Sequence, residues 1–300
     1  MTFILFDNNL TERINPCIVQ YIFYSWNLKM KNKIFSFCYW LKITLINLKN
    51  CNFFAYGISY FLYKFINKNK IKKLSKYHNI HSGQCVILGT GPSLTLDNLE
   101  KLIRANKYVF IGVNTLYKIY SELHWKADYY CVIDPNTYAY VGEDIKKYHR
   151  SDLFIASNRI KDTDKNVNKF CLNCSSLYKL SKQEYFSEIG FSSDITKDVF
   201  DGCSVVYASL QIAVYMGFKE IYLLGVDCNY ESKIENHSEI LSYGENYKYA
   251  WSKLTGKRMI QGLSIAKKFA ENHNIKIYNL SQKGNLDLFE KVDINEVIGQ

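Results

Sequence analysis

From about residue 81 to the C-terminus, short apolar runs alternate with longer segments of helical periodicity. Six apolar runs predict strands, at residues 84–88, 108–113, 129–133, 153–156, 221–225 and 276–279. Four segments predict helices, at residues 96–106, 142–148, 204–216 and 257–272. Strands that are apolar throughout are typical of a parallel sheet covered on both faces. The pattern therefore predicts an α/β fold with a mostly parallel sheet and helices on both of its faces.

Polar or glycine-containing clusters directly follow several of these strands. Ligands bind at the carboxyl ends of parallel strands, so these clusters predict a nucleotide-type site. Glycines next to a helix N-terminus would let the backbone approach a phosphate. The candidate nucleotide-binding residues are Gly89, Thr90, Gly91, Pro92 and Ser93 after the first strand, Asn114, Asp134 and Asp227 after later strands, and Gly202, Cys203 and Ser204 before the apolar helix.

A stretch of about 30 residues, 228–256, shows little periodicity and is rich in aromatic side chains. A loop of that length within a compact domain is commonly a lid or a binding loop. We therefore expect His237 to act as a catalytic base. Tyr243 and Tyr247 are candidates to donate a hydrogen bond to a departing group.

The positive charge of the chain is confined to its N-terminal part. Of the 38 Lys and Arg residues, 12 lie in residues 1–80, and of the 28 Asp and Glu residues only 2 do. The remaining 220 residues hold 26 of each kind and are neutral. A neutral body is not a basic nucleic-acid clamp, because phosphate neutralisation needs clustered Lys and Arg. With 48% hydrophobic and 16% aromatic residues, the composition also argues against disorder.

Residues 1–80 carry aromatic and aliphatic runs broken by lysines, without an uncharged run of the ~18–20 residues that span a bilayer. Four lysines repeat every four residues, at Lys64, Lys68, Lys72 and Lys76. This spacing predicts a basic helix on an anionic membrane surface. A solvated face packed on the body and a marginal transmembrane pass at residues 43–63 remain alternatives. No cleavable signal pattern is evident, so we expect a cytoplasmic protein, peripheral on the inner face of the cytoplasmic membrane.

The cysteines predict a reducing compartment. There are nine, an odd number, and only Cys171 and Cys174 form a C-x-x-C pair. A zinc site would need a second pair or histidines at ligand spacing, and neither is present. We therefore favour no metal site from the cysteines.

Taken together, several motifs resemble the MptE-like superfamily, which includes 6-hydroxymethylpterin diphosphokinase-like domains. They are Gly89-Thr90-Gly91-Pro92-Ser93, Asn114, Asp134-Pro135, Gly202-Cys203-Ser204-Val205 and the run from Met216 to Asp227. The chain is also similar to Rossmann-like bacterial sialyltransferases, which use CMP-activated sugars in surface-polysaccharide synthesis. The resemblance covers roughly residues 84–285 and implies a Rossmann-like nucleotide-binding transferase domain.

The resemblance also implies roles for particular residues. The sialyltransferases have Asn in the first loop where this chain has Thr90, and a catalytic His in the lid, which His237 would supply. They need no metal. The diphosphokinase-like branch tends to carry an acid at the position of Asp134. In that case Asp134 and Asp227 would hold Mg²⁺ on a triphosphate.

Three hypotheses follow. The favoured one is a glycosyltransferase that moves a sugar from a nucleotide donor, CMP-linked in preference, to a bacterial surface-glycan or lipid-linked acceptor without a cofactor. The alternative is a Mg-dependent diphosphokinase that transfers pyrophosphate from ATP to a small alcohol. The third is a non-catalytic nucleotide-binding or scaffold protein. The expected organisation is a basic, aromatic-rich helical segment at 1–80 and a transferase domain at 81–300.

Overall fold

The computed structural model describes residues 51–174, 189–229, 241 and 255–299. The chain divides into two compact units, Met1–Asn67 and Lys68–Gln300. The described part of the first unit is helix α4 (Cys51–Ile66) together with Asn67. His237, Tyr243 and Tyr247 lie outside the described residues, as does most of the predicted lid.

The second unit is built on an eight-stranded sheet whose paired strands are all parallel, in the order β10-β9-β8-β1-β2-β3-β4-β5. All six predicted strands are present within one residue of their predicted bounds, which confirms the predicted fold class. The strands are β1 (Gln84–Leu88), β2 (Tyr108–Val113), β3 (Tyr129–Val132), β4 (Leu153–Ala156), β5 (Asn168–Phe170), β8 (Glu220–Leu224), β9 (Lys276–Asn279) and β10 (Glu290–Lys291). A separate two-stranded sheet pairs β6 (Leu172–Asn173) with β7 (Val199–Phe200).

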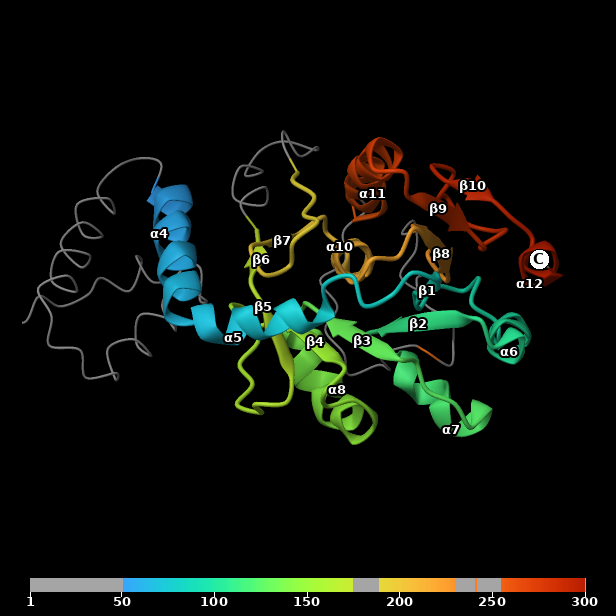
Figure 1. The fold of residues 1–300 in the computed structure, drawn as a ribbon, viewed down its shortest axis with the longest axis horizontal. Helices are drawn as coiled ribbons and strands as arrows, with labels where there is room; N and C mark the ends of the chain where they lie inside the picture. Colours follow the sequence, from blue (N-terminus) through green and yellow to red (C-terminus); the bar gives the residue numbers. More distant parts are fainter. Residues whose placement is uncertain (1–50, 175–188, 230–240, 242–254, 300) are drawn as a thin grey trace, which may run out of the picture. The chain divides into compact units, whose positions relative to one another are not determined.

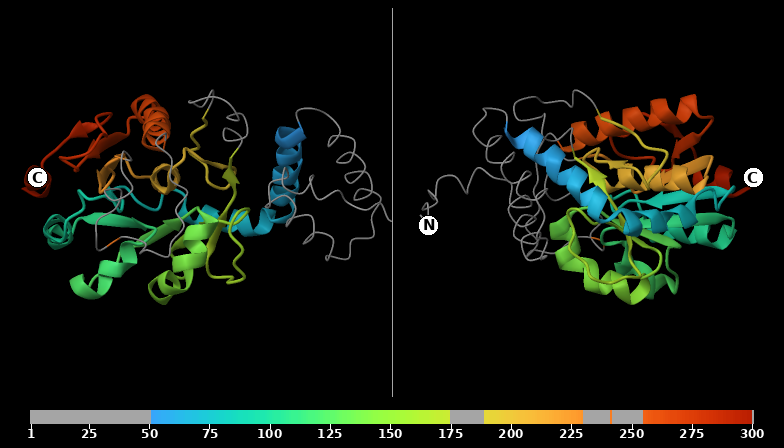
Figure 2. Two further views of the ribbon diagram at one scale, coloured as in Figure 1. Left: turned by 180° about the vertical axis from the view of Figure 1, so that it is seen from behind. Right: turned by 60° about the vertical axis from the view of Figure 1, so that its left-hand side comes forward.

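Helices cover both faces of this sheet, as Figure 1 shows. On one face lie α10 (Val205–Met216) and α11 (Thr255–Asn272), and α10 contacts β1, β2 and β3. On the other lie α6 (Leu96–Ala105), α7 (Tyr120–Leu123) and α8 (Pro135–Tyr148), with α12 (Ile294–Gly299) packed on α6. Figure 2 shows the same three layers from the side. As its apolar sequence predicts, α10 is buried on nearly every side.

Local capping fixes where the helices begin. Thr95 accepts a hydrogen bond from the N–H of Asn98 at the start of α6, and Ser204 accepts one from Val206 at the start of α10. Helix α8 starts seven residues before its predicted position at 142. Asp134 caps it by accepting from the N–H of Thr137, and Pro135 occupies the first turn, where no N–H is needed. The Asp-Pro pair is therefore a helix start and not only a turn.

The four evenly spaced lysines do not line one helix. Lys64 lies in α4 of the first unit, whereas Lys68 and Lys72 lie in α5 (Lys68–Lys72) and Lys76 in a 3₁₀ helix, η1 (Lys73–Tyr77). Ile71, Leu74 and Tyr77 are buried within the second unit, where the Tyr77 hydroxyl donates to the Ser151 carbonyl at 2.7 Å. The body unit therefore begins at Lys68, before the predicted boundary at 81.

In the described segments, no helix combines the length and the hydropathy that crossing a bilayer would require.

The backbones of the loops after β1 and β8 approach each other closely. A Cβ on Gly89 would collide with the carbonyl oxygen of Gly225, and Gly225 itself has a φ of +73°. The two glycines are thus required for two reasons, space at Gly89 and left-handed backbone geometry at Gly225. Strand order reverses between β1 and β8, so this contact lies at the topological switch point of the sheet.

We expect Gly89→Ala to lower the free energy of unfolding by about 3 kcal/mol, because the added methyl meets backbone that cannot rotate away. Urea denaturation monitored by circular dichroism measures the change. Gly83→Ala is the matched control, since its Cβ would meet nothing within 4 Å. Equal stability of the two variants would contradict the assigned role of Gly89.

Candidate functional site

The loop after β1 is tied to the loops after β8 and β9. Gly89 N–H donates to Leu224 O at 2.8 Å and Gly91 N–H to Gly225 O at 2.9 Å. The Ser93 hydroxyl donates to the hydroxyl of Ser281 at 2.7 Å. The main-chain donors of the loop are therefore already used within the protein. Phosphate binding by this loop stays a prediction, and the N–H groups of Gly89 and Gly91 serve close packing at the switch point.

Asp227 lies at the centre of these hydrogen bonds between the loops. Its Oδ2 accepts the N–H of Ser93 at 2.9 Å, and its carbonyl accepts the N–H of Asn285 at 2.7 Å. The side chain is buried, and Oδ1 has no hydrogen-bond partner among the residues that the structure describes. Burial raises the pKa of Asp227 above its usual value, against the opposing effect of the hydrogen bonds to Ser93. Asp227 thus links the loops after β1 and β8 through hydrogen bonds. Its second carboxylate oxygen is a buried acceptor without a partner among the described residues.

Asn114 lies directly after β2 with a φ of 51°, in the left-handed region. Its carbonyl accepts from the Tyr130 hydroxyl at 2.9 Å, and its side-chain amide makes no hydrogen bond to the described residues. The neighbouring Thr115 hydroxyl donates to the carbonyl of Leu241 at 2.5 Å, and Leu241 is buried in the core. Leu241 belongs to the predicted lid and comes four residues after His237. This one residue of the lid is therefore anchored next to Asn114.

Asp134 and Asp227 follow strands that are not neighbours in the sheet. Their strands, β3 and β8, are separated by β1 and β2, which at ~4.8 Å per strand is about 14 Å. Mg²⁺ takes its oxygen ligands at about 2.1 Å, so a shared ion would require the two carboxylates to converge from loops whose strands have this spacing. Asp134 is also engaged as the cap of α8 through a 2.8 Å bond from Thr137 N–H. The described residues include no group of three or more His, Cys, Asp or Glu placed to hold a metal.

The segment from Asp201 to Ser204 opens α10 beside these residues. The buried Asp201 carboxylate accepts the N–H of Cys203 at 2.8 Å and lies 3.3 Å from a guanidinium nitrogen of Arg159. Burial raises the pKa of Asp201, whereas the charge of Arg159 lowers it. Cys203 has a φ of 61°, in the left-handed region. The backbone here therefore does not follow the geometry of a regular strand.

Two main-chain donors of this segment remain available. Within the described chain, neither the N–H of Gly202 nor that of Ser204 donates a hydrogen bond. Both precede a helix of 12 residues, whose N-terminus carries a partial positive charge. Gly202 is packed against α11, since a Cβ on Gly262 would stand 2.8 Å from the carbonyl oxygen of Gly202. An anion can be held here by main-chain N–H groups.

Sequence analysis did not single out the two arginines at this edge. Arg159 follows β4, and Arg258 lies in the first turn of α11. The only sequence signal was their position, one directly after a predicted strand and the other at the start of a predicted helix. Their partners come from distant segments, so spacing along the chain could not reveal them.

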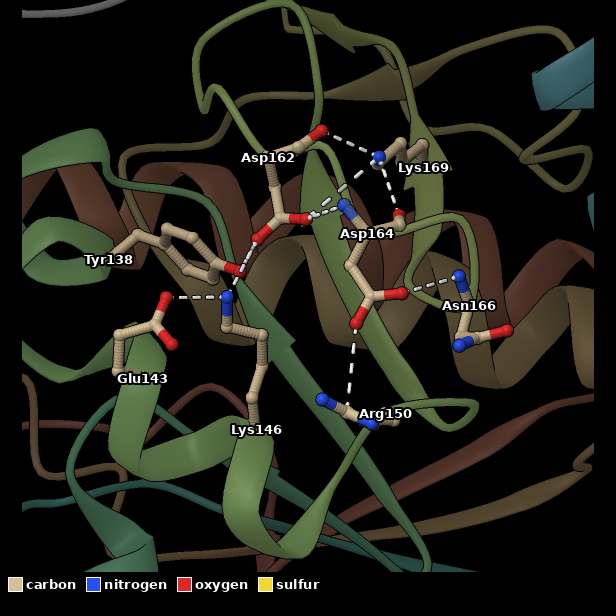
Figure 3. A network of polar contacts seen from close by, with 8 residues as sticks. All are labelled: Tyr138, Glu143, Lys146, Arg150, Asp162, Asp164, Asn166 and Lys169. Carbon is tan, nitrogen blue, oxygen red and sulfur yellow. Dashed lines mark hydrogen bonds and ion pairs between the residues drawn. The ribbon is translucent and has the colours of Figure 1, made fainter.

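A polar network holds the loop that begins with Arg159 (Figure 3). The Asp162 carboxylate accepts from the Tyr138 hydroxyl at 2.5 Å and lies 3.3 Å from Lys146 Nζ. Lys169 Nζ donates to the carbonyls of Asp162 and Asp164 at 2.6 and 2.8 Å. Burial by itself would raise the pKa of Asp162, but the hydrogen bonds from Tyr138, Asp164 and Lys146 hold it below its usual value. The loop after β4 is thereby fixed to α8, whose first turn is capped by Asp134.

Comparison with known proteins places this geometry in context. A family model described as "6-hydroxymethylpterin diphosphokinase MptE-like" matches residues 61–233. Among solved structures, the MAf glycosyltransferase from Magnetospirillum magneticum AMB-1 is similar at 14% sequence identity and a TM-score of 0.44, over 76% of this chain and 38% of that one. The chain thus corresponds to well under half of that protein's length. A search of curated protein sequences finds no match.

We expect Asp162→Asn to lower the free energy of unfolding at pH 7 by about 3 kcal/mol, because two lysines lose a buried counter-charge. The folded-state pKa of Asp162 is depressed, so its stabilisation is present above the unfolded value of about 4 and is lost as pH falls through the folded value. Urea denaturation at pH 7 and pH 3 should show the gap between wild type and variant closing at low pH. Asp287→Asn, which breaks the exposed pair with Lys291, is the control and should change stability by at most about 0.5 kcal/mol. A gap that does not narrow at all as the pH falls would rule out this role of the Asp162 charge.

Proposed function

The chain belongs to the MptE-like family, and from that premise we propose that it is a glycosyltransferase that uses a nucleotide-activated sugar. The family match confirms the resemblance drawn from the sequence and supports a transferase. The proposed donor is a CMP-linked sugar, and the proposed acceptor is a surface glycan or a lipid-linked glycan.

One observation favours sugar transfer over pyrophosphate transfer. Among the described residues, the main-chain N–H groups of Gly202 and Ser204 at the start of α10 donate no hydrogen bond, whereas the two candidate metal-binding carboxylates follow strands whose axes are about 14 Å apart. Helix-terminal N–H groups stabilise a departing phosphate without a metal. We take this arrangement to favour sugar transfer over a triphosphate held by one Mg²⁺ between Asp134 and Asp227.

The proposed reaction needs three groups. A base removes the proton of the acceptor hydroxyl, and we assign this role to His237. The phosphate of the nucleotide leaves against Gly202 and Ser204, with Tyr243 or Tyr247 donating a further hydrogen bond. The anchoring of Leu241 at Thr115 supports the placement of this lid segment next to the nucleotide. Asn114, whose amide is not engaged in the described chain, would hydrogen-bond the nucleoside.

We further propose that the N-terminal unit brings the enzyme to an anionic membrane surface, where lipid-linked acceptors reside. Phe61 and Phe65 of α4 are 70% and 72% exposed, and Lys64 lies between them in sequence. Exposed phenylalanines next to a lysine are the groups that enter the interface of an anionic bilayer. The association would be peripheral, on the cytoplasmic face.

The reaction is tested by measuring sugar transfer from CMP-, UDP- and GDP-linked donors with EDTA present. We expect turnover with EDTA in the wild type and in Asp134→Asn, because Asn caps a helix as well as Asp does. We expect a loss of about 100-fold or more in His237→Ala.

The alternatives give different results. An absolute requirement for Mg²⁺, together with inactivity of Asp134→Asn, would establish the diphosphokinase instead. Full activity of His237→Ala would refute the base assignment. Nucleotide binding without any turnover would indicate the non-catalytic protein.

Membrane association is tested in the full-length chain by co-sedimentation with vesicles containing anionic lipid. We expect the double substitution Phe61→Ser and Phe65→Ser to weaken binding, and added salt to weaken it further because charge contributes. Tyr140→Ser is the control, since Tyr140 is an exposed aromatic residue of α8 in the body. Equal binding by wild type and the double variant would exclude α4 as the membrane contact.

A further inference from the structure

Arg258 lies over the segment that opens α10. It precedes Gly262 by four residues in α11, so both residues face the same side of that helix. Gly262 touches the backbone of Gly202, because a Cβ there would stand 2.8 Å from the Gly202 oxygen and 3.2 Å from its Cα. The first turn of α11 therefore places Arg258 next to the loop of residues 201–204.

The guanidinium group of Arg258 has no partner in the described chain. Arg104, Arg150 and Arg159 each pair with a carboxylate, at 2.8, 3.7 and 3.3 Å. Arg258 makes no hydrogen bond or ion pair to a described residue, although its side chain is half-buried and its Nε is fully buried. Burying part of a charged group without a partner is unfavourable, so an anion at this position would relieve the cost.

A second arginine, Arg159, contacts the same segment through Asp201. Arg159 is held by the buried Asp201, whose other oxygen accepts the N–H of Cys203. Burial, and then the Asp201 carboxylate, raise the pKa of the Cys203 thiol to about 12, whereas the charges of Arg258 and Arg159 lower it. The charges of both guanidinium groups therefore act on Cys203. The Asp201 charge offsets that of Arg159, which leaves Arg258 as the uncompensated cation of the pair.

We propose that Arg258 binds the phosphate of the nucleotide donor, with the N–H groups of Gly202 and Ser204 on the phosphate's opposite side and Arg159 as a fixed neighbouring charge. This inference rests on the proposed function and assigns its phosphate-binding residue. The planar fork of a guanidinium suits two phosphate oxygens at once.

The role of Arg258 grows as the donor reacts. The bond between the anomeric carbon and the phosphate oxygen breaks, and its electron pair stays on that oxygen. The acceptor oxygen bonds to the anomeric carbon, and its proton passes to the base. The leaving phosphate gains negative charge in this step, so a guanidinium that contacts it stabilises the transition state more than the bound donor.

Binding of CMP and of cytidine to the full-length protein, followed by calorimetry and thermal shift, separates the phosphate contribution from that of the nucleoside. We expect Arg258→Gln to weaken CMP binding by about 10- to 100-fold and to leave cytidine binding unchanged. Arg258→Lys should give an intermediate affinity, since it keeps the charge and loses the fork. Without ligand, the melting temperature of Arg258→Gln should equal or exceed that of the wild type, because no described protein contact is lost. Lys257→Gln, at the exposed neighbouring position, should behave as wild type.

The possible outcomes are distinct. If the wild type prefers CMP to cytidine and Arg258→Gln keeps that preference, this assignment fails while the proposed function stands. If Arg258→Gln weakens CMP and cytidine equally, the residue supports the fold and does not bind phosphate. If the wild type binds none of CMP, UDP, GDP and ATP, the proposed function itself is refuted, and this assignment with it.

Discussion

The close contact between the loops after β1 and β8 is the constraint on which the functional edge depends. Only glycine at position 89 lets the two backbones meet, and only a left-handed residue at position 225 turns the chain away from β8. The sheet reverses its order at this point, so every later loop of the carboxyl edge is positioned relative to it. Asp227, Ser93 and Ser281 then join the loops after β1, β8 and β9 into one hydrogen-bonded unit.

That rigidity has a consequence for ligand binding. A glycine-rich turn after the first strand commonly offers its N–H groups to a phosphate, but here those of Gly89, Gly91 and Ser93 are occupied by β8 and its loop. Among the described residues, two N–H groups that donate no hydrogen bond lie at the start of α10, and Arg258, which has no partner there, lies in the first turn of α11. The proposed anion site is thereby separate from the part of the edge that stabilises the fold.

Much of the architecture could be predicted from local sequence. Buried strands and the apolar helix α10 were recognisable because their apolar pattern is continuous and their flanking polar residues are clear. The start of α8 was missed because Asp134-Pro135 suits both a turn and a helix cap, and only the hydrogen bond to Thr137 distinguishes them. The four lysines looked like one helical stripe because the break at Asn67 has no glycine or proline to mark it.

The sequence by itself determined the class of fold and the family, and it predicted which loops would form the nucleotide site, because all of these follow from short-range patterns of apolar and polar residues. The tertiary structure alone decided which members of those loops remain free to act. Whether an N–H, a carboxylate or a guanidinium is available depends on partners far along the chain: Gly91 on Gly225, Ser93 on Asp227, and Arg159 on Asp201. Strand order likewise decided that Asp134 and Asp227 stand apart. Each of these relations joins groups that are distant in sequence. The spacing of residues along the chain does not predict which of them meet in space.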